Sequence, residues 1–299
     1  MGRQFLKASA NIETFSEIGK VLHKIGRYLR FFSNFILKSF CDIGQLIIGP
    51  CHNGHHDSMY ETLHCIALRT IKYSDSRSIL SAWSAERGYV SFAIPSGKGR
   101  EAARRRALTM PLGAFEGICD VRPDRDVLFI RDIKPMSVGM SMISDPAKMA
   151  MALFLSEVLE KLLRNAGHDE RLSLTVFDTV DALNSAGPRG VANFALWTLY
   201  RLTIPLGIEP DMSDWKRGAL FDIEAARWRM SMPLSGDAFS GDEAKAVKML
   251  SRLTRANIER VRLTRAARRA LLDGLLRYYD LHYCRLSPLH SLDVVNELF

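Results

Sequence analysis

Residues 77–135 combine short strand-like runs with a strongly basic segment, and this combination constrains the fold more than any other part of the chain. In the run 89–94, Val90, Phe92 and Ile94 alternate with Tyr89, Ser91 and Ala93, which is the two-residue period of a half-buried strand. A glycine-rich segment follows, opened by Ile94-Pro95-Ser96-Gly97-Lys98-Gly99-Arg100 and ended by Arg104, Arg105 and Arg106. We expect this segment to form a cationic loop between two strands.

Five strand-like runs are expected in the same region, at 61–71, 78–84, 88–94, 110–120 and 127–134. Gly88 and the pair Pro123-Asp124 supply turn signals between them. Short strands of this number and spacing are typical of a small barrel such as the OB-fold. We therefore expect an OB-fold domain at residues 59–136, with Trp83 and Phe92 in its core.

The remaining residues, 137–299, carry helical patterns. Asp145-Pro146 predicts a helix start, with a capping carboxylate before a proline at the first helical position. Apolar spacing predicts further helices at about 171–185, 189–206, 240–256, 264–283 and 289–298. The interval 210–234 interrupts this pattern and predicts a hairpin-like insert. The expected fold class is thus α+β: an N-terminal OB-fold β-barrel followed by an all-α helical domain with a small insert.

The positive charge of the chain is concentrated in its strand-rich part. The net charge is +8, and residues 59–136 carry 13 Lys and Arg against 9 Asp and Glu, whereas residues 137–299 carry 21 against 20. This asymmetry favours a polyanionic partner for the barrel. The expected contact residues are Arg69, Lys72, Arg77, Lys98, Arg100, Arg104, Arg105 and Arg106.

Two further sets of residues leave alternatives open. Tyr89 lies on the strand face opposite Phe92 and is either a stacking platform for a base or part of the packing. A second basic set in the helical part is either a second polyanion surface or a solvated helix face paired with Glu259 and Asp273. Its members are Arg252, Arg255, Arg260, Arg262, Arg265, Arg268 and Arg269.

Residues 1–58 differ from the rest and also allow two interpretations. Their apolar residues recur at helical spacing among lysines and arginines, which would suit a helix on a membrane surface. We favour an extension upstream of the true start at Met59, or a poorly ordered segment. The cluster Cys51, His52, His55 and His56 has no second half to complete a zinc site, and we interpret it as a solvated connector.

The sequence predicts neither a catalytic centre nor a cofactor. The segment SGKGRE lacks the upstream glycine and the Ser or Thr of a P-loop. The five cysteines are scattered and odd in number, which disfavours a disulfide scaffold and favours a reducing cytosol. His282 and His290 are interpreted as structural. A binding protein is the reading that these observations favour.

Several stretches after Met59 resemble the RecO family of recombination mediator proteins, especially its zinc-less, Bacteroidetes-like members. They include TLHCIALRTIKYSDSRSILSAWSAERGYVSF, MPLGAFEGICDV, DPAKMAMALFLSEVLEKLL, GPRGVANFALWTLYRLTIPLGIEPD and LLRYYDLHYCRLSPLHSLDVVNELF. The resemblance implies an OB-fold followed by a helical domain. It implies binding of single- and double-stranded DNA, annealing of complementary strands, and a location in the cytoplasm at the nucleoid, with no membrane partner.

The resemblance also implies protein partners. These are RecR, the acidic C-terminal tail of single-stranded DNA-binding protein and, indirectly, RecA, which is loaded on coated strands. For the tail, the helical domain offers Phe154, Leu155, Phe194, Trp197 and Tyr200, with Arg201 and Lys161 nearby, although such residues are also typical of a core. The alternative function is a basic membrane-surface or protein–protein adaptor without DNA activity.

Many members of the family hold a zinc ion in an insert after a turn like the one at 206–210. The interval 210–233 of this chain contains no cysteine, so the resemblance does not extend to the metal. We expect a small zinc-less hairpin around Phe221 and Trp228.

Overall fold

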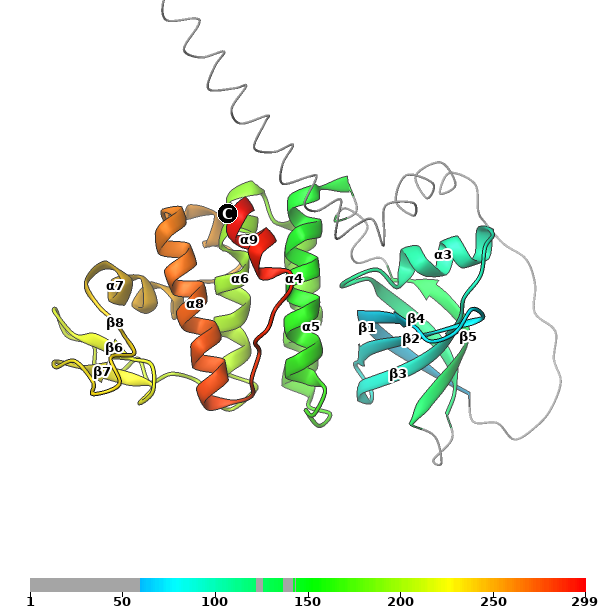
Figure 1. The fold of residues 1–299 in the computed structure, drawn as a ribbon, viewed down its shortest axis with the longest axis horizontal. Coiled ribbons are helices and arrows are strands. Elements are labelled where there is room, and N and C mark those ends of the chain that lie inside the picture. Colours follow the sequence, from blue (N-terminus) through cyan, green and yellow to red (C-terminus); the bar gives the residue numbers. More distant parts are fainter. Residues whose placement is uncertain (1–59, 122–125, 137–141, 143) are drawn as a thin grey trace, which may run out of the picture.

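In the computed structural model, which describes residues 60–121, 126–136, 142 and 144–299, the first five strands close into a barrel (Figure 1). They are β1 (Tyr60–Lys72), β2 (Arg77–Ser84), β3 (Gly88–Pro95), β4 (Ala114–Asp120) and β5 (Val127–Pro135). The strand order is β1-β2-β3-β5-β4, and β3 pairs with β5 in parallel. This arrangement is consistent with the expected OB-fold.

Strand β1 buries both of its faces. Leu63, Cys65 and Ala67 point into the barrel, whereas Ile66 and Leu68 belong to the core shared with the helices. The register with β2 shifts between Ala67 and Arg69, so Leu68 has no paired residue on β2. The second buried face explains the continuous apolar run at 65–68.

The segment expected to be a cationic loop is largely helical. Helix α3 (Arg100–Leu108) lies between β3 and β4, and the fourth strand begins at Ala114 rather than at residue 110. Alanine and arginine are strong helix formers, and they make up most of this segment. The turn after α3 is tight, since a Cβ at Gly113 would lie 2.4 Å from the carbonyl oxygen of Leu108. The expectation of a loop followed by a long strand was wrong at these positions.

The second domain is built from helices, as expected. They are α4 (Pro146–Leu163), α5 (Glu170–Ser185), α6 (Pro188–Thr203), α7 (Gly241–Leu250), the 3₁₀ turn η2 (Ile258–Arg260), α8 (Arg265–His282) and α9 (Leu292–Leu298). The carboxylate of Asp145 accepts from the backbone N–H groups of Ala147 and Lys148, which confirms the predicted helix start. Figure 1 shows α4 and α5 next to the barrel, with α6 and α8 on the side away from the barrel.

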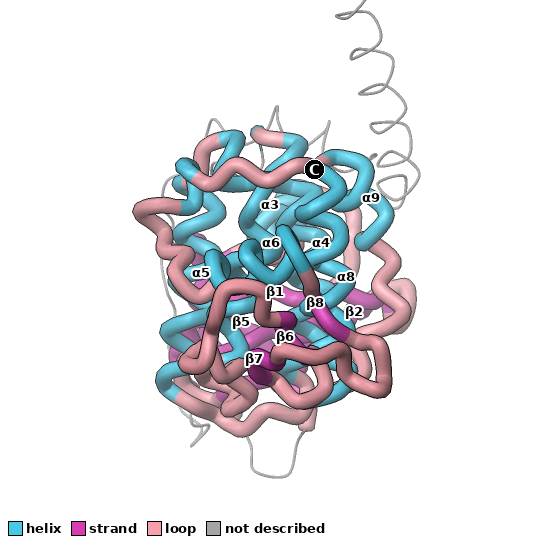
Figure 2. Tube along the Cα trace, turned by 90° about the vertical axis from the view of Figure 1, so that its left-hand side faces the viewer, coloured by secondary structure: helices cyan, strands magenta, loops and turns pink. Residues whose placement is uncertain are grey.

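The insert forms a three-stranded sheet at the end of the helical domain away from the barrel (Figure 1), and its strands face the viewer in Figure 2. Its strands are β6 (Leu220–Asp222), β7 (Arg227–Arg229) and β8 (Ala238–Phe239), in the order β7-β6-β8. Phe221 lies opposite Trp228, and their ring centroids are 5.2 Å apart. This confirms the expected hairpin and adds a third strand. No cluster of three or more metal-ligating His, Cys, Asp or Glu residues is present among the described residues.

The turn between β2 and β3 docks the barrel on the helical domain. Trp83 is fully buried, and its indole N–H donates to the Ser173 hydroxyl of α5 at 3.1 Å. A ring nitrogen of His168 lies 2.7 Å from the carbonyl oxygen of Ala85. At Gly88, whose φ is +74°, a Cβ would lie 3.2 Å from the Cα of His168. The two domains therefore share a tightly packed interface.

None of the described helices is both long and apolar enough to cross a lipid bilayer. The proposed amphipathic pattern and the Cys–His cluster fall in residues 1–58, and the turn signal Pro123-Asp124 falls in 122–125. Both segments lie outside the described residues.

The interface predicts a graded response to substitution at Trp83. Trp83→Ala should lower the free energy of unfolding by about 3–5 kcal/mol, because it removes a large side chain from the shared core. Trp83→Phe should cost on the order of 1 kcal/mol, because most of the packing stays and mainly the hydrogen bond to Ser173 is lost. Denaturant unfolding followed by circular dichroism measures both, and equal losses would contradict this account.

The insert predicts indifference to chelators. EDTA should leave the melting temperature unchanged, because the apolar pair Phe221 and Trp228 holds the sheet together. Phe221→Ala should lower it by about 10 °C, as expected for deletion of a buried aromatic ring. A drop in melting temperature on adding EDTA alone would show that a bound metal stabilises the fold.

Candidate nucleic-acid interface

Four of the expected cations gather where the β1–β2 turn meets the segment leading into α3. The backbone N–H of Ser96 donates to the carbonyl oxygen of Ser76 at 2.8 Å. The hydroxyls of Ser78 and Ser96 lie 2.7 Å apart. These bonds hold the two segments side by side. They carry the cations that we call the rim: Lys72, Arg77, Lys98 and Arg100, all exposed.

The positive charge of the rim is only weakly neutralised by Asp75, which lies in the β1–β2 turn. Lys72 donates to Asp75 at 2.7 Å, and this bond lowers the pKa of the Asp75 carboxyl. Both side chains are exposed, and such pairs contribute little to stability because water screens them. A phosphate can therefore compete for Lys72 at small cost.

The three consecutive arginines of α3 do not form one cluster. Successive residues of a helix point about 100° apart, so Arg104, Arg105 and Arg106 face different directions. Arg104 pairs with Glu101 at 3.1 Å, and Arg106 donates to the carbonyl oxygen of Gly97 at 2.8 Å. Burial and the neighbouring charge of Arg105 lower the pKa of Arg106. The polyanion contact expected of these three arginines stays a prediction, and Arg106 also helps to hold the rim segment in place.

Three aromatic rings of the described barrel region are exposed, and the sequence pattern singled out none of them: Tyr73 in the β1–β2 turn, and Phe129 and Tyr60 on the strands. Phe129 of β5 is 37% exposed, with the Arg77 guanidinium carbon 5.6 Å from its ring centroid. Tyr60 of β1 is 47% exposed, with Arg131 at 5.0 Å in the same way. A bulge at Arg131 changes which residues of β5 face outward, so the two-residue period of 127–134 did not reveal Phe129. Tyr60 lies just before the expected first strand, 61–71.

The structure places Tyr89 at the domain interface. Its ring packs against the shared core, and its hydroxyl donates to Glu160 of α4 at 3.3 Å. This environment does not present the ring as an open platform, so the packing interpretation of Tyr89 is the one that fits. Trp83 and Phe92 are fully buried, which confirms their expected place in the core.

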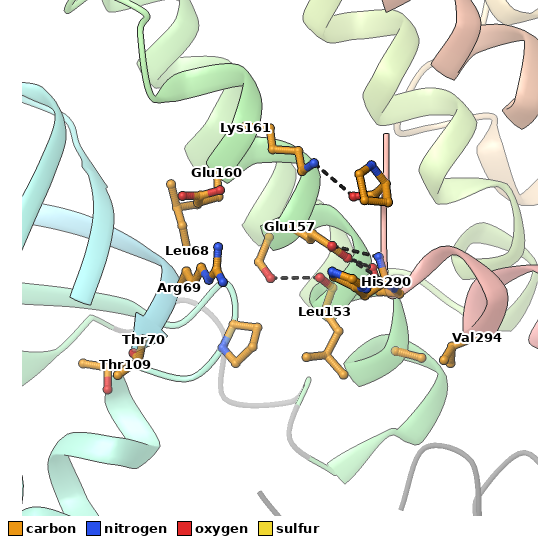
Figure 3. Close-up of a pocket in the computed structure, with 15 residues that line it drawn as sticks. Leu68, Arg69, Thr70, Thr109, Leu153, Glu157, Glu160, Lys161, His290 and Val294 are labelled. Carbon is orange, nitrogen blue, oxygen red and sulfur yellow. Dashed lines mark hydrogen bonds between the residues drawn. The ribbon is translucent and has the colours of Figure 1, made fainter. Parts of the chain in front are cut away.

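Arg69 is separated from the rim. It lines a cleft of about 490 Å³ between the barrel and the helical domain (Figure 3). Glu157 and Lys161 of α4 form part of the opposite wall. Glu157 accepts from the backbone N–H groups of His290 and Ser291, which agrees with a structural place for His290. Arg69 therefore faces the helices and not the β1–β2 turn.

Much of the second basic set has structural partners that the sequence did not predict. Arg255 pairs with Asp181 at 2.7 Å. Arg265 donates to the carbonyl oxygen of Asn296, and Arg268 to that of Leu263. Glu259, one of the acids expected to pair with these arginines, instead accepts from the backbone N–H of Gly187. These arginines tie helices together in the described structure.

The side chains considered for tail docking belong to the helical core. Phe154 and Leu155 of α4 and Phe194, Trp197 and Tyr200 of α6 are all buried. Arg201 lies over the Trp197 ring at 4.6 Å and pairs with Asp178. Lys161 donates to the carbonyl oxygen of Pro288. Phe194 and Trp197 also line a small cavity of about 160 Å³ beside Arg255, and Lys161 lines the cleft next to the barrel, so the five apolar side chains serve mainly as core.

Comparison with known proteins identifies relatives of both domains. Residues 143–293 match the family model described as "Recombination protein O C terminal". A DNA repair protein RecO of Porphyromonas gingivalis is 34% identical over 244 residues, covering 78% of this chain and 97% of that protein. The RecO of Phocaeicola vulgatus is 30% identical over 234 residues, with the same coverage. The RecO of Azobacteroides pseudotrichonymphae is 25% identical over 241 residues, covering 81% and 99%.

Proposed function

Because this chain belongs to the RecO family of DNA repair and recombination proteins, we propose that it binds single- and double-stranded DNA and anneals complementary strands. The rim of the barrel is the proposed contact surface. The proposed activity is binding, with no bond made or broken in the DNA. The single observation that carries this proposal is the gathering of Lys72, Arg77, Lys98 and Arg100 by the hydrogen bonds between residues 76–78 and Ser96.

Electrostatics supports a phosphate contact at the rim. Each phosphate that a lysine or arginine neutralises releases condensed counterions from the DNA, and this release favours binding at low salt. Lys98 and Arg100 lie on either side of Gly99, whose φ of 132° is a conformation suited to glycine. The backbone there is thus shaped to bring two cations into one short turn before α3.

Annealing requires more than one strand to be held at once, because two phosphate backbones repel each other. The rim supplies one cationic surface. The second basic set supplies the proposed second surface through four exposed arginines: Arg252, Arg260, Arg262 and Arg269. Arg104, Arg105 and Arg69 are proposed as peripheral contacts that extend the rim along α3 and toward the cleft.

The proposed partners follow from membership of the family. We propose that the protein acts with RecR, docks the acidic tail of single-stranded DNA-binding protein, and helps to load RecA on coated strands, in the cytoplasm at the nucleoid. An annealing assay with strands coated by single-stranded DNA-binding protein tests this directly. Acceleration by the protein, and further stimulation of RecA loading by RecR, is the expected result. A protein that binds only anionic vesicles would instead support the adaptor function.

The rim predicts a specific change in salt dependence. Arg77→Ala/Lys98→Ala/Arg100→Ala should weaken binding to single-stranded DNA and reduce the slope of log K against log salt by up to about 2 units, since each phosphate contact contributes about 0.7. Arg104→Ala/Arg105→Ala/Arg106→Ala removes the same charge but should change the slope by less, because these side chains point in different directions. Fluorescence anisotropy over a series of salt concentrations measures both slopes.

A third variant separates a local contact from net charge. Lys216→Ala/Arg217→Ala/Arg227→Ala also removes three positive charges, from exposed positions in the insert, at the opposite end of the molecule (Figure 1). It should leave the slope near the wild-type value. Equal effects of all three variants would show that the overall charge of the protein, and not the rim, controls binding.

A further inference from the structure

Tyr60 and Phe129 occupy one row across three neighbouring strands of the barrel. In the strand register, Tyr60 of β1 pairs with Asp120 of β4, and Asp120 pairs with Phe129 of β5. Directly paired residues share a face of the sheet, so both rings stand on the outer face, about 10 Å apart across two strand spacings. The two rings therefore lie on the same outer surface of the barrel.

These rings differ from the other aromatic residues of the barrel strands in exposure. Phe92 and Phe115 fill the interior and are fully buried, with ring centroids 6.2 Å apart. Trp83 is fully buried at the domain interface. Phe129 and Tyr60 remain 37% and 47% exposed. Strand β5, which carries Phe129, lies on the side of the barrel away from α4 and α5 (Figure 1).

Each ring is paired with an arginine that can contact a phosphate. Arg77 and Arg131 lie within the distance of a cation–π contact, at 5.6 and 5.0 Å from their ring centroids. A surface that binds single-stranded nucleic acid combines aromatic faces for the bases with cations along the backbone. Arg77 also belongs to the rim, so the row adjoins the proposed phosphate-binding surface at Phe129, while Asp120 lies between the two rings.

We infer that Phe129 and Tyr60 are base-stacking positions for single-stranded DNA, with Arg77 and Arg131 holding the adjoining phosphates. This inference rests on the proposed DNA binding and names the part of the strand that the barrel recognises. A duplex hides the faces of its bases, so the rings act on single strands alone, whereas the cations act on both forms. The row thereby gives the barrel a preference for unpaired strands.

The test separates stacking from charge. Phe129→Ala and Tyr60→Ala should each weaken binding of single-stranded DNA about 5- to 150-fold, the range for loss of one stacked base. Their salt slope and their affinity for duplex DNA should stay at wild-type values, because no charge changes. Arg77→Ala should instead lower both affinities and the slope. Phe129→Trp keeps an aromatic ring, so it should bind single-stranded DNA as the wild-type protein does. The fluorescence of the introduced indole should be quenched on adding oligothymidylate.

A matched control is available in Tyr283 of the helical domain, which is 37% exposed like Phe129. Tyr283→Ala should leave binding unchanged, and thermal melting of every variant checks that it is folded. Two outcomes for Phe129→Ala and Tyr60→Ala would overturn the stacking inference and leave DNA binding itself intact. One is wild-type affinity for single-stranded DNA, and the other is an equal loss of affinity for single- and double-stranded DNA. Failure of the wild-type protein to bind either form would instead overturn the proposed function.

Discussion

The packing of the barrel wall against α4 and α5 is the constraint on which the rest of the structure depends. Ile66, Leu68 and Trp83 point away from the barrel interior and pack in the core of the helical domain, so one side of the barrel is covered. Tyr89 is drawn into the same interface by Glu160. Because this side is closed, a partner must approach the barrel from the rim, from α3 or from the outer face of β4 and β5.

The remaining open surface carries cations at the rim and beside the two exposed rings. The hydrogen bonds of Ser96 bring the cations of two separate segments together, and the aromatic row lies beside them with its own arginines. Acidic residues lie near these cations too: Asp75 pairs with Lys72, Glu101 pairs with Arg104, and Asp120 lies between the two rings. Exposed pairs of this kind are screened by water, so they compete only weakly with a phosphate.

Stability and binding are divided between different parts of the chain. The small sheet of the insert is held by Phe221, Trp228 and Phe239, all buried, and α8 accommodates it through Gly274, where a Cβ would lie 1.9 Å from the Phe239 ring. Arginines of the second basic set meanwhile tie α8 to later residues, Arg265 to the carbonyl oxygen of Asn296 and Arg268 to that of Phe299. In this domain arginines therefore serve partly as structural donors, which lowers the number available for phosphates.

Local patterns in the sequence determined the strands, the start of α4 at Asp145 and the hairpin around Phe221 and Trp228, because period, capping and turn residues are short-range signals. The order of barrel and helices was evident for the same reason. The helix at residues 100–108 also had a local signal, its alanine and arginine content, which the expectation of a loop overlooked. Tertiary structure alone decided that Tyr89 is covered and that Arg69 faces a cleft. It also decided that Phe129 and Tyr60 share a row, because strand register and bulges depend on partners distant in the sequence.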